Sequence, residues 1–316
     1  MTDLDLFAIG SWTIFDHIFK LSAYPSPGDT VTLNMPVERL DATYYGECSA
    51  NVAAVAAKLG LKSGLGMVVG DDFVKSGYQT HLLELGVYLA GVEIIQDRRS
   101  GHSYLYFDAN GDGFCISHLG IAENQASWQV PKAIITSART VVINESFSPY
   151  TLAAIKLAKD AGALTAINGM VGTAGDQAQA YLEQTDILFI SESELAMLLS
   201  DLGIDDIAGL HSVGPKKVFT TLGARGSRVY VGDTIIDVTA VPAAQVVDPT
   251  GAGDAYVAGT LTGLLKGLPV RQAARVGATV SSFVVEKWGC QTNLPAWHAV
   301  QQRYEQFFQE ELAQCK

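Results

Sequence analysis

The chain has 316 residues, enough for one large domain or two average ones. Its 21 Lys and Arg against 33 Asp and Glu give a formal net charge of −12, which disfavours nucleic-acid binding because that binding depends on clustered cations. Hydrophobic residues make up 48% and charged residues 17%, a composition that excludes a disordered chain and predicts a large core. No apolar run reaches the roughly 18 to 20 residues that a membrane helix needs.

The cysteines and the first residues indicate the compartment. The segment from Met1 to Asp5 carries acids where a secretory signal would carry cations. The four cysteines are far apart and form no C-x-x-C pair of the kind that binds zinc or cycles redox state; they are Cys48, Cys115, Cys290 and Cys315. We therefore expect an acidic cytoplasmic protein with free thiols and no membrane partner.

Short β-rich runs alternate with helical ones along the chain. Leu4–Ile9 is expected as a strand, Ala50–Leu59 as a helix, Leu65–Val69 as a strand, and a helix is expected from Asp71 to about Leu85. Later strands are expected at Thr140–Ile143, Leu164–Ile167, Ile187–Ile190 and Val218–Leu222, with helices between them that include Thr151–Ala161 and Ser193–Leu199. Strands that are apolar throughout and alternate with helices predict a parallel sheet covered on both faces.

Two segments interrupt this alternation. Val31–Tyr45 has a strand-like composition, and Ser103–Ser117 has the pattern of a hairpin around the turn-forming pair Asn110-Gly111. We expect insertions at 24–45 and 98–119 to form a small β-lid on a single domain that spans residues 1–316.

The sharpest motif is Asp248-Pro249-Thr250-Gly251-Ala252-Gly253-Asp254, between a strand and a helix that runs to about Lys266. Small residues at 251–253 let the backbone approach a ligand, and their N–H groups lie at the positive end of the helix. This arrangement suits the charge of a transferring phosphoryl group. Asp254 can accept the proton of an attacking hydroxyl. A bare G-x-G-D is more often only a glycine turn with an acid near a helix start.

The context of the motif favours chemistry, because 248–254 resembles the C-terminal signature of the ribokinase/PfkB family of ATP-dependent carbohydrate and nucleoside kinases. The resemblance extends from about Leu6 to Pro295. It includes Gly10-Ser11 followed by Asp16-His17-Ile18, the segment Gly46-Glu47-Cys48-Ser49-Ala50-Asn51-Val52-Ala53, the triplet Gly70-Asp71-Asp72, and the turn Thr221-Leu222-Gly223-Ala224-Arg225-Gly226. The order and spacing of these motifs are more specific than any one of them.

The resemblance implies a three-layer α/β/α fold with a mostly parallel central sheet, and it implies a role for each matching residue. Catalysis would belong to Asp254 as base with an anion hole at Gly251, Ala252 and Gly253. The acceptor would contact Asp16, Gly46, Glu47, Asn51 and Glu145. The ATP site would be lined by Ser191, Thr221, Gly223 and Gly226. Metal-site positions are Glu194 for Mg²⁺, and Asp248, Thr250, Gly289 and Asn293 for a monovalent cation such as K⁺. In the family the lid often supplies a dimer interface, so the resemblance also implies a homodimer.

Each role has a plain structural alternative. Asp16 can be a loop acid, Asn51 can cap a helix, Glu145 can stabilise a turn, and 221–226 can be a hairpin connection. Two positions also depart from the family pattern. Glu47 stands where the second glycine of a G-G pair is usual, and Ser191 stands where the N-x-x-E motif linked to magnesium has Asn.

The sequence disfavours a P-loop kinase and a dehydrogenase. A Walker A loop is absent, and Gly64–Gly70 lacks the strand-to-helix context of a dinucleotide fingerprint. A non-catalytic binding protein would be expected to have a damaged base or anion hole, and both are intact. We expect an ATP-dependent kinase that phosphorylates a sugar or polyol hydroxyl. The alternative is a nucleoside kinase, with Trp12, Phe15 and Tyr44 as candidates for a base slot.

Overall fold

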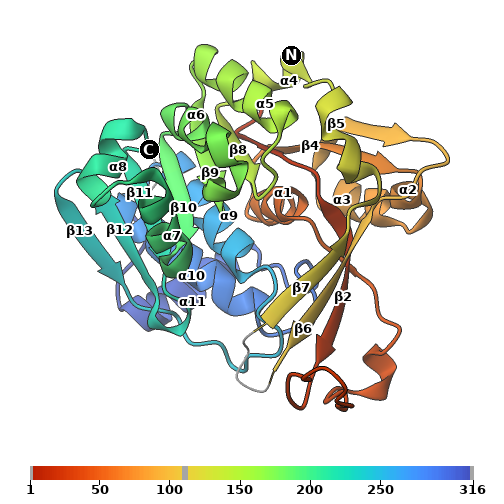
Figure 1. The fold of residues 1–316 in the computed structure, drawn as a ribbon. Coiled ribbons are helices and arrows are strands. Elements are labelled where there is room, and N and C mark those ends of the chain that lie inside the picture. The colour runs from red at the N-terminus through yellow and green to blue at the C-terminus, as the bar shows by residue number, and fades with distance from the viewer. Residues whose placement is uncertain (1–2, 109–112, 314–316) are drawn as a thin grey trace.

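The computed structural model describes residues 3–108 and 113–313. Its main feature is a nine-stranded sheet with the strand order β13-β12-β11-β10-β9-β8-β1-β4-β5 (Figure 1). The strands are β1 (Leu6–Ile9), β4 (Ser63–Gly70), β5 (Tyr88–Ile95), β8 (Thr140–Asn144), β9 (Leu164–Asn168), β10 (Ile187–Ser191), β11 (Lys217–Thr221), β12 (Ser227–Val231) and β13 (Thr234–Val238). From β11 to β5 all neighbours are parallel, and β12 is antiparallel to both of its neighbours.

Alternate residues of each strand enter opposite cores, which gives three layers. In β1, Leu6 and Ala8 pack into one core and Phe7 and Ile9 into the other. Helices on the first face are α1 (Cys48–Lys58), α9 (Ala252–Leu265), α10 (Val270–Val284) and α11 (Trp297–Phe308). The second face is covered by α4 (Lys132–Ile135), α5 (Pro149–Asp160), α6 (Ala178–Glu183), α7 (Glu192–Leu202) and α8 (Ile207–Val213). The predicted α/β/α architecture is confirmed.

Beyond β4 the chain forms two short helices where one was predicted. They are α2 (Asp72–Lys75) and α3 (Tyr78–Glu84). Gly77 separates them with a φ of 84°, a left-handed conformation that an α-helix does not continue through. The prediction of one helix from Asp71 to Leu85 is therefore wrong in its continuity.

A second, four-stranded sheet has the order β3-β2-β6-β7 and extends from one end of the main sheet (Figure 1). Its strands are β2 (Thr13–Lys20), β3 (Tyr44–Tyr45), β6 (Gly101–Phe107) and β7 (Gly113–His118). The prediction missed β2. It was wrong to make all of 31–45 strand-like, because this segment has a 3-10 turn (Val37–Arg39) and only Tyr44–Tyr45 as a strand. The predicted turn at Asn110-Gly111 lies outside the described residues.

The two faces of the small sheet differ. Ile14, Asp16 and Ile18 are buried on the face toward the main domain. On the other face rings stack from strand to strand, with Phe19 against Tyr106 and Tyr106 against Phe114. This alternation places the Asp16 carboxyl beneath the sheet, where it can contact the site.

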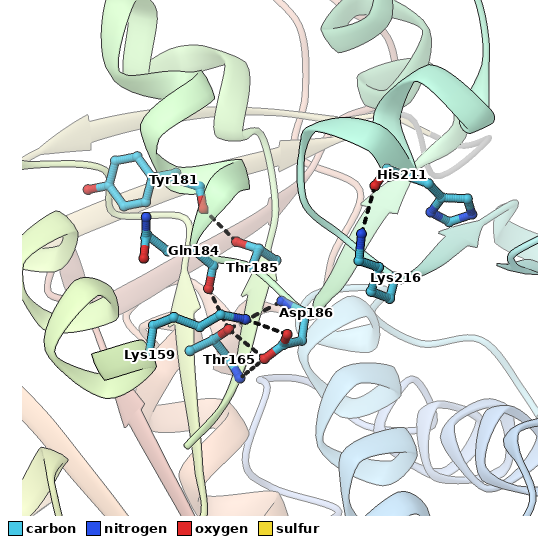
Figure 2. A network of polar contacts seen from close by, with 8 residues as sticks. All are labelled: Lys159, Thr165, Tyr181, Gln184, Thr185, Asp186, His211 and Lys216. Carbon is cyan, nitrogen blue, oxygen red and sulfur yellow. Dashed lines mark hydrogen bonds and ion pairs between the residues drawn. The ribbon is translucent and has the colours of Figure 1, made fainter. Parts of the chain in front are cut away.

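A polar network fixes the N-terminal ends of β9, β10 and β11, at the edge of the main sheet away from the site (Figure 2). Asp186 accepts hydrogen bonds from the amide and hydroxyl of Thr165, both at 3.0 Å, and pairs with Lys159 at 2.5 Å. The carbonyl of Asp186 accepts from the amide of Lys216 at 2.9 Å. Since β9 is only five residues long, a register fixed at Thr165 also fixes Asn168 at the other end of the strand.

None of the helices in the described ranges is long and apolar enough to cross a membrane.

Candidate active site

The candidate site lies at the carboxyl ends of the parallel strands, where β1 adjoins β8. The chain leaves β1 toward β4 on one side, while β8 and the later strands lie on the other side. Such a switch in strand order opens a crevice in α/β sheets. Polar residues end three successive strands there, namely Asn144 on β8, Asn168 on β9 and Ser191 on β10.

Asp254 lies in the first turn of α9 and is almost fully buried, with 6% of its surface exposed. Two amides hold its carboxylate. The Asn51 side chain donates to Oδ2 at 2.8 Å, and the Asn168 side chain donates to Oδ1 at 3.0 Å. Burial raises the pKa of Asp254 to about 6, although both amide hydrogen bonds favour the charged form. The carboxyl is thus held in place and can change protonation near neutral pH.

The turn before Asp254 is shaped by Gly251, which has a φ of 79° and immediately precedes α9. A Cβ at this position would lie 2.8 Å from the Cβ of Cys290. A larger residue would therefore be strained and would clash. The N–H groups of 251–253 begin the 14-residue helix α9, an arrangement that suits an anionic group.

Asp16 lies on β2 against Gly46, and a Cβ on Gly46 would be 2.2 Å from Asp16 Oδ2. Cys290 donates its thiol to the same oxygen at 3.6 Å. Burial, together with the charges of Asp248 and Asp254, raises the pKa of Asp16 to about 7, although the hydrogen bond from this thiol lowers it. Gly46 is required here because the carboxyl takes the space of a side chain.

Gln291 connects the two sides of the site. Its amide donates to Asn51 Oδ1 at 2.8 Å and to the Tyr78 hydroxyl at 2.6 Å. The Tyr78 hydroxyl in turn donates to the Gly46 carbonyl at 2.6 Å. Gln291 therefore orients the Asn51 side chain through its oxygen, while the nitrogen of the same side chain donates to Asp254.

A cavity of about 170 Å³ opens beside Asp254, and it brings together predicted residues that are far apart in the sequence. It is lined by Glu145, Asn168, Gly169, Phe189, Ile190, Ser191, Glu194, Thr221, Gly253 and Val257. Gly223 and Gly226 do not line this cavity. They lie in the connection between antiparallel strands β11 and β12, where a Cβ on Gly226 would lie 2.0 Å from the Val238 carbonyl oxygen.

Ser191 and Glu194 form a capping box at the start of α7. The Ser191 hydroxyl accepts from the Glu194 amide at 3.3 Å, and the Glu194 carboxylate accepts from the Ser191 amide at 2.8 Å. Glu145, with a positive φ of 49°, extends into the same cavity. Desolvation and the charges of Asp254 and Glu194 raise the pKa of Glu145 to about 7.

These carboxylates fit Mg²⁺ bound together with phosphates. Within 3–108 and 113–313, no three His, Cys, Asp or Glu side chains form a metal cluster. Mg²⁺ in phosphoryl-transfer sites, however, takes one or two carboxylates and completes its shell with water and phosphate oxygens. Glu145 and Glu194 on one cavity wall meet that requirement.

Asp248 joins the loop before α9 to the segment after α10. Its Oδ1 accepts from the amide and hydroxyl of Thr250 at 3.0 and 2.6 Å, and its Oδ2 accepts from the Gly289 amide at 2.8 Å. Asn293 donates to the Phe283 carbonyl at 2.5 Å. Lys20, at the end of β2, donates to the Val247 carbonyl at 2.5 Å and so connects the small sheet to this loop.

Sequence reasoning missed Asn168, Gln291 and Cys290. Asn168 had a usable signal, because a polar residue before Gly169 at the end of a buried parallel strand is typical of a site. Gln291 and Cys290 had none, because their partners lie more than 200 residues away.

Comparison with known proteins identifies the family. The model of the pfkB family carbohydrate kinases matches residues 37–297. The chain belongs to this family. It is 31% identical over 296 residues to a nucleoside kinase of Methanothermobacter thermautotrophicus, with 93% of each chain covered. The kinase transfers a phosphoryl group to a hydroxyl of a sugar or nucleoside.

One solved structure supports this assignment, and a second shows the same fold. The Methanocaldococcus jannaschii nucleoside kinase, at 27% identity, superposes with a TM-score of 0.82 over 97% of this chain and 100% of that one. An Arabidopsis thaliana ribokinase complexed with ribose and ATP shares the fold, with a TM-score of 0.76 at 23% identity over 96% of this chain and 99% of that one.

The geometry predicts how activity depends on pH. If Asp254 acts as a base it must be deprotonated, so kcat should then rise with pH through about 6, the pKa of Asp254. In Asn168→Ala the carboxylate loses one amide donor, which should move this acid limb upward by roughly one pH unit. The exposed Asn124→Ala is the control and should leave the profile unchanged. An unchanged profile in Asn168→Ala, measured by steady-state kinetics from pH 5 to 9, would contradict this role.

Proposed function

We propose that this kinase transfers the γ-phosphoryl group of ATP to a hydroxyl of a nucleoside, with Asp254 as the base. The observation that carries the chemistry is the buried carboxyl of Asp254, held by two amides beside a glycine-rich helix start and a cavity lined by acids. The 31% identity to a nucleoside kinase over 93% of both chains favours this acceptor.

The reaction needs one proton transfer and one displacement. Asp254 takes the proton of the acceptor hydroxyl, and that oxygen forms a bond to the γ-phosphorus. The bond from phosphorus to the β–γ bridging oxygen breaks, and ADP leaves with the electron pair. The amides of 251–253 face the negative charge of the transferring group, a charge that such preorganised donors stabilise without reorganising.

The cavity beside Asp254 would hold the phosphates of the donor. Ser191 and Thr221 offer hydroxyls on its wall, and Gly253 brings it next to the base. Glu145 and Glu194 would hold Mg²⁺, which neutralises phosphate charge when bound. These two carboxyls are also near enough to affect each other, because the charge of Glu194 raises the pKa of Glu145.

The acceptor side favours an uncharged substrate. Asp16, Glu47 and Asp254 are all buried, and in the described ranges none of them pairs with Lys, Arg or His. A phosphorylated acceptor would bring a dianion close to these acids without a compensating cation. Of the three aromatic candidates for a base slot, Phe15 and Tyr44 are packed in the core, while Trp12 is 41% exposed. Trp12 is therefore the candidate to contact the nucleobase of the acceptor.

The expected insertions 24–45 and 98–119, which contribute β3, β6 and β7 to the small sheet, would serve together with β2 as the lid over the acceptor. It supplies Asp16 from β2, and its Lys20 contacts the loop that leads to the anion hole. Closing this sheet over a bound acceptor would exclude water and so limit ATP hydrolysis.

The proposal is tested by ADP release from Mg-ATP against purine and pyrimidine nucleosides, free ribose and other sugars, polyols and amino sugars. We expect nucleosides to give the highest kcat/KM. Asp254→Asn, prepared identically, should lower kcat by roughly 100-fold or more while nucleotide affinity is kept. A free sugar or polyol as the best acceptor would assign the enzyme to that class, whereas unchanged turnover in Asp254→Asn would refute the mechanism.

A monovalent cation is expected to activate the enzyme through the Asp248 loop. The buried Asp248 carboxylate holds Thr250 and Gly289 together, and a cation among these groups would order the loop that carries the anion hole. The rate in K⁺ should exceed the rate in tetramethylammonium, which is too bulky for such a loop. Equal rates in the two salts at matched ionic strength would contradict this expectation.

A further inference from the structure

Glu47 has a backbone conformation that is costly for its residue type. Its φ of 74° and ψ of 122° lie in a region that glycine adopts and residues with a Cβ avoid. The residue directly precedes α1, where an ordinary capping residue with extended backbone would serve. Conformational strain of this kind persists where the surroundings enforce it, and it is concentrated at functional sites.

Only one of the two carboxyl oxygens of Glu47 accepts a hydrogen bond of good geometry in the described residues. Glu47 is 5% exposed, and its Oε2 accepts from the Ala50 amide at 2.8 Å as a helix cap. No donor with hydrogen-bonding geometry reaches its buried Oε1 in the described part of the chain, although the amide and hydroxyl of Ser49 lie near the carboxyl and lower its pKa. A buried polar atom without a partner is costly unless a water or a ligand completes it. The capping role explains Oε2 and leaves Oε1 unexplained.

The surroundings of Glu47 place it on the acceptor side of the site. The preceding residue, Gly46, packs directly against the Asp16 carboxyl. Four residues along α1, Asn51 holds the base Asp254. The Glu47 carboxyl is itself near enough to Asp254 that this charge, together with burial, raises the pKa of Glu47 to about 8. Glu47 thus lies among the groups nearest the reacting hydroxyl.

We propose that Glu47 is a specificity-determining residue whose free carboxyl oxygen, Oε1, hydrogen bonds to a ribose ring hydroxyl of the bound nucleoside. A hydroxyl both donates and accepts, so it pairs with this carboxyl whether or not the carboxyl is protonated. A ribose hydroxyl fits better than a group on the nucleobase. Glu47 lies with Gly46, Asp16 and Asn51 on the side of the site close to Asp254, where the reacting sugar would be. This inference rests on the proposed function and names the part of the acceptor that the site reads.

The test compares adenosine or cytidine, whichever is the better acceptor, with its 2′-deoxy and 3′-deoxy analogues. In the native enzyme one of the two deletions should lower kcat/KM by roughly 10-fold to 100-fold, the cost of one hydrogen bond to a charged or buried polar group. Glu47→Gly suits the backbone and should keep or raise the melting temperature. It should lose activity on the full nucleoside through KM and no longer distinguish the analogue. Glu47→Gln should retain part of the discrimination.

A matched control separates this role from helix capping. Ser148→Gly removes the cap of α5, away from Asp254, and should leave the discrimination intact. An equal loss on all three acceptors in Glu47→Gly, or an unchanged ratio between them, would overturn the proposal. If no nucleoside is phosphorylated, the proposed acceptor class fails, and ribose against 2-deoxyribose then tests Glu47 separately.

Discussion

The site depends on one buried carboxylate, that of Asp254, which pairs with no Lys, Arg or His among the residues that the structure describes. Asp254 is held by Asn51 from α1 and Asn168 from β9, two residues that are far apart in the sequence and that the fold brings to the same carboxyl. Amide donors stabilise the carboxylate without neutralising it, and burial keeps its pKa near 6. A lysine in place of either amide would hold the same carboxyl in a salt bridge and lower its basicity. The amides therefore leave a carboxyl that is fixed in position and able to accept a proton near neutral pH.

The other buried acids on the acceptor side, Asp16 and Glu47, also form no ion pair in the described residues. Burial raises the pKa of Asp16 and Glu47 as well, to about 7 and about 8. Lys20 lies at the end of β2 and donates to the Val247 carbonyl in the loop before α9 rather than to one of these acids. In the proposed reaction such a site would bind hydroxyls by hydrogen bonds and repel anions, while the phosphates on the cavity side would be held by the helix dipole, by hydroxyls and by Mg²⁺ on the two glutamates. The acceptor and the phosphates would then meet at Asp254 and Gly253.

Much of this arrangement could be predicted from the sequence. Apolar runs such as Leu65–Val69 identified buried parallel strands because their composition excludes a solvated face. The 248–254 motif predicted the loop and the helix start that carry Asp254 because its residues are contiguous and locally constrained; the roles of base and anion hole stay predictions. Local reasoning failed where a residue's role depends on distant partners. β2 was missed because Asp16 and His17 interrupt its apolar pattern, and the strand is defined by its pairing with β6. Gln291 could not be found because Asn51 and Tyr78, which it orients, are distant in sequence.

The most direct test of the central claim is a titration of the Asp254 carboxyl itself. Carbon-13 NMR of protein labelled at the aspartate side-chain carboxyls, compared with Asp254→Asn, would assign the resonance that the variant lacks. The account predicts that this resonance titrates with a pKa near 6 in the absence of substrates. A missing resonance that titrates near 4, the ordinary value for an exposed aspartate, would show that the carboxyl is not desolvated and would contradict the account.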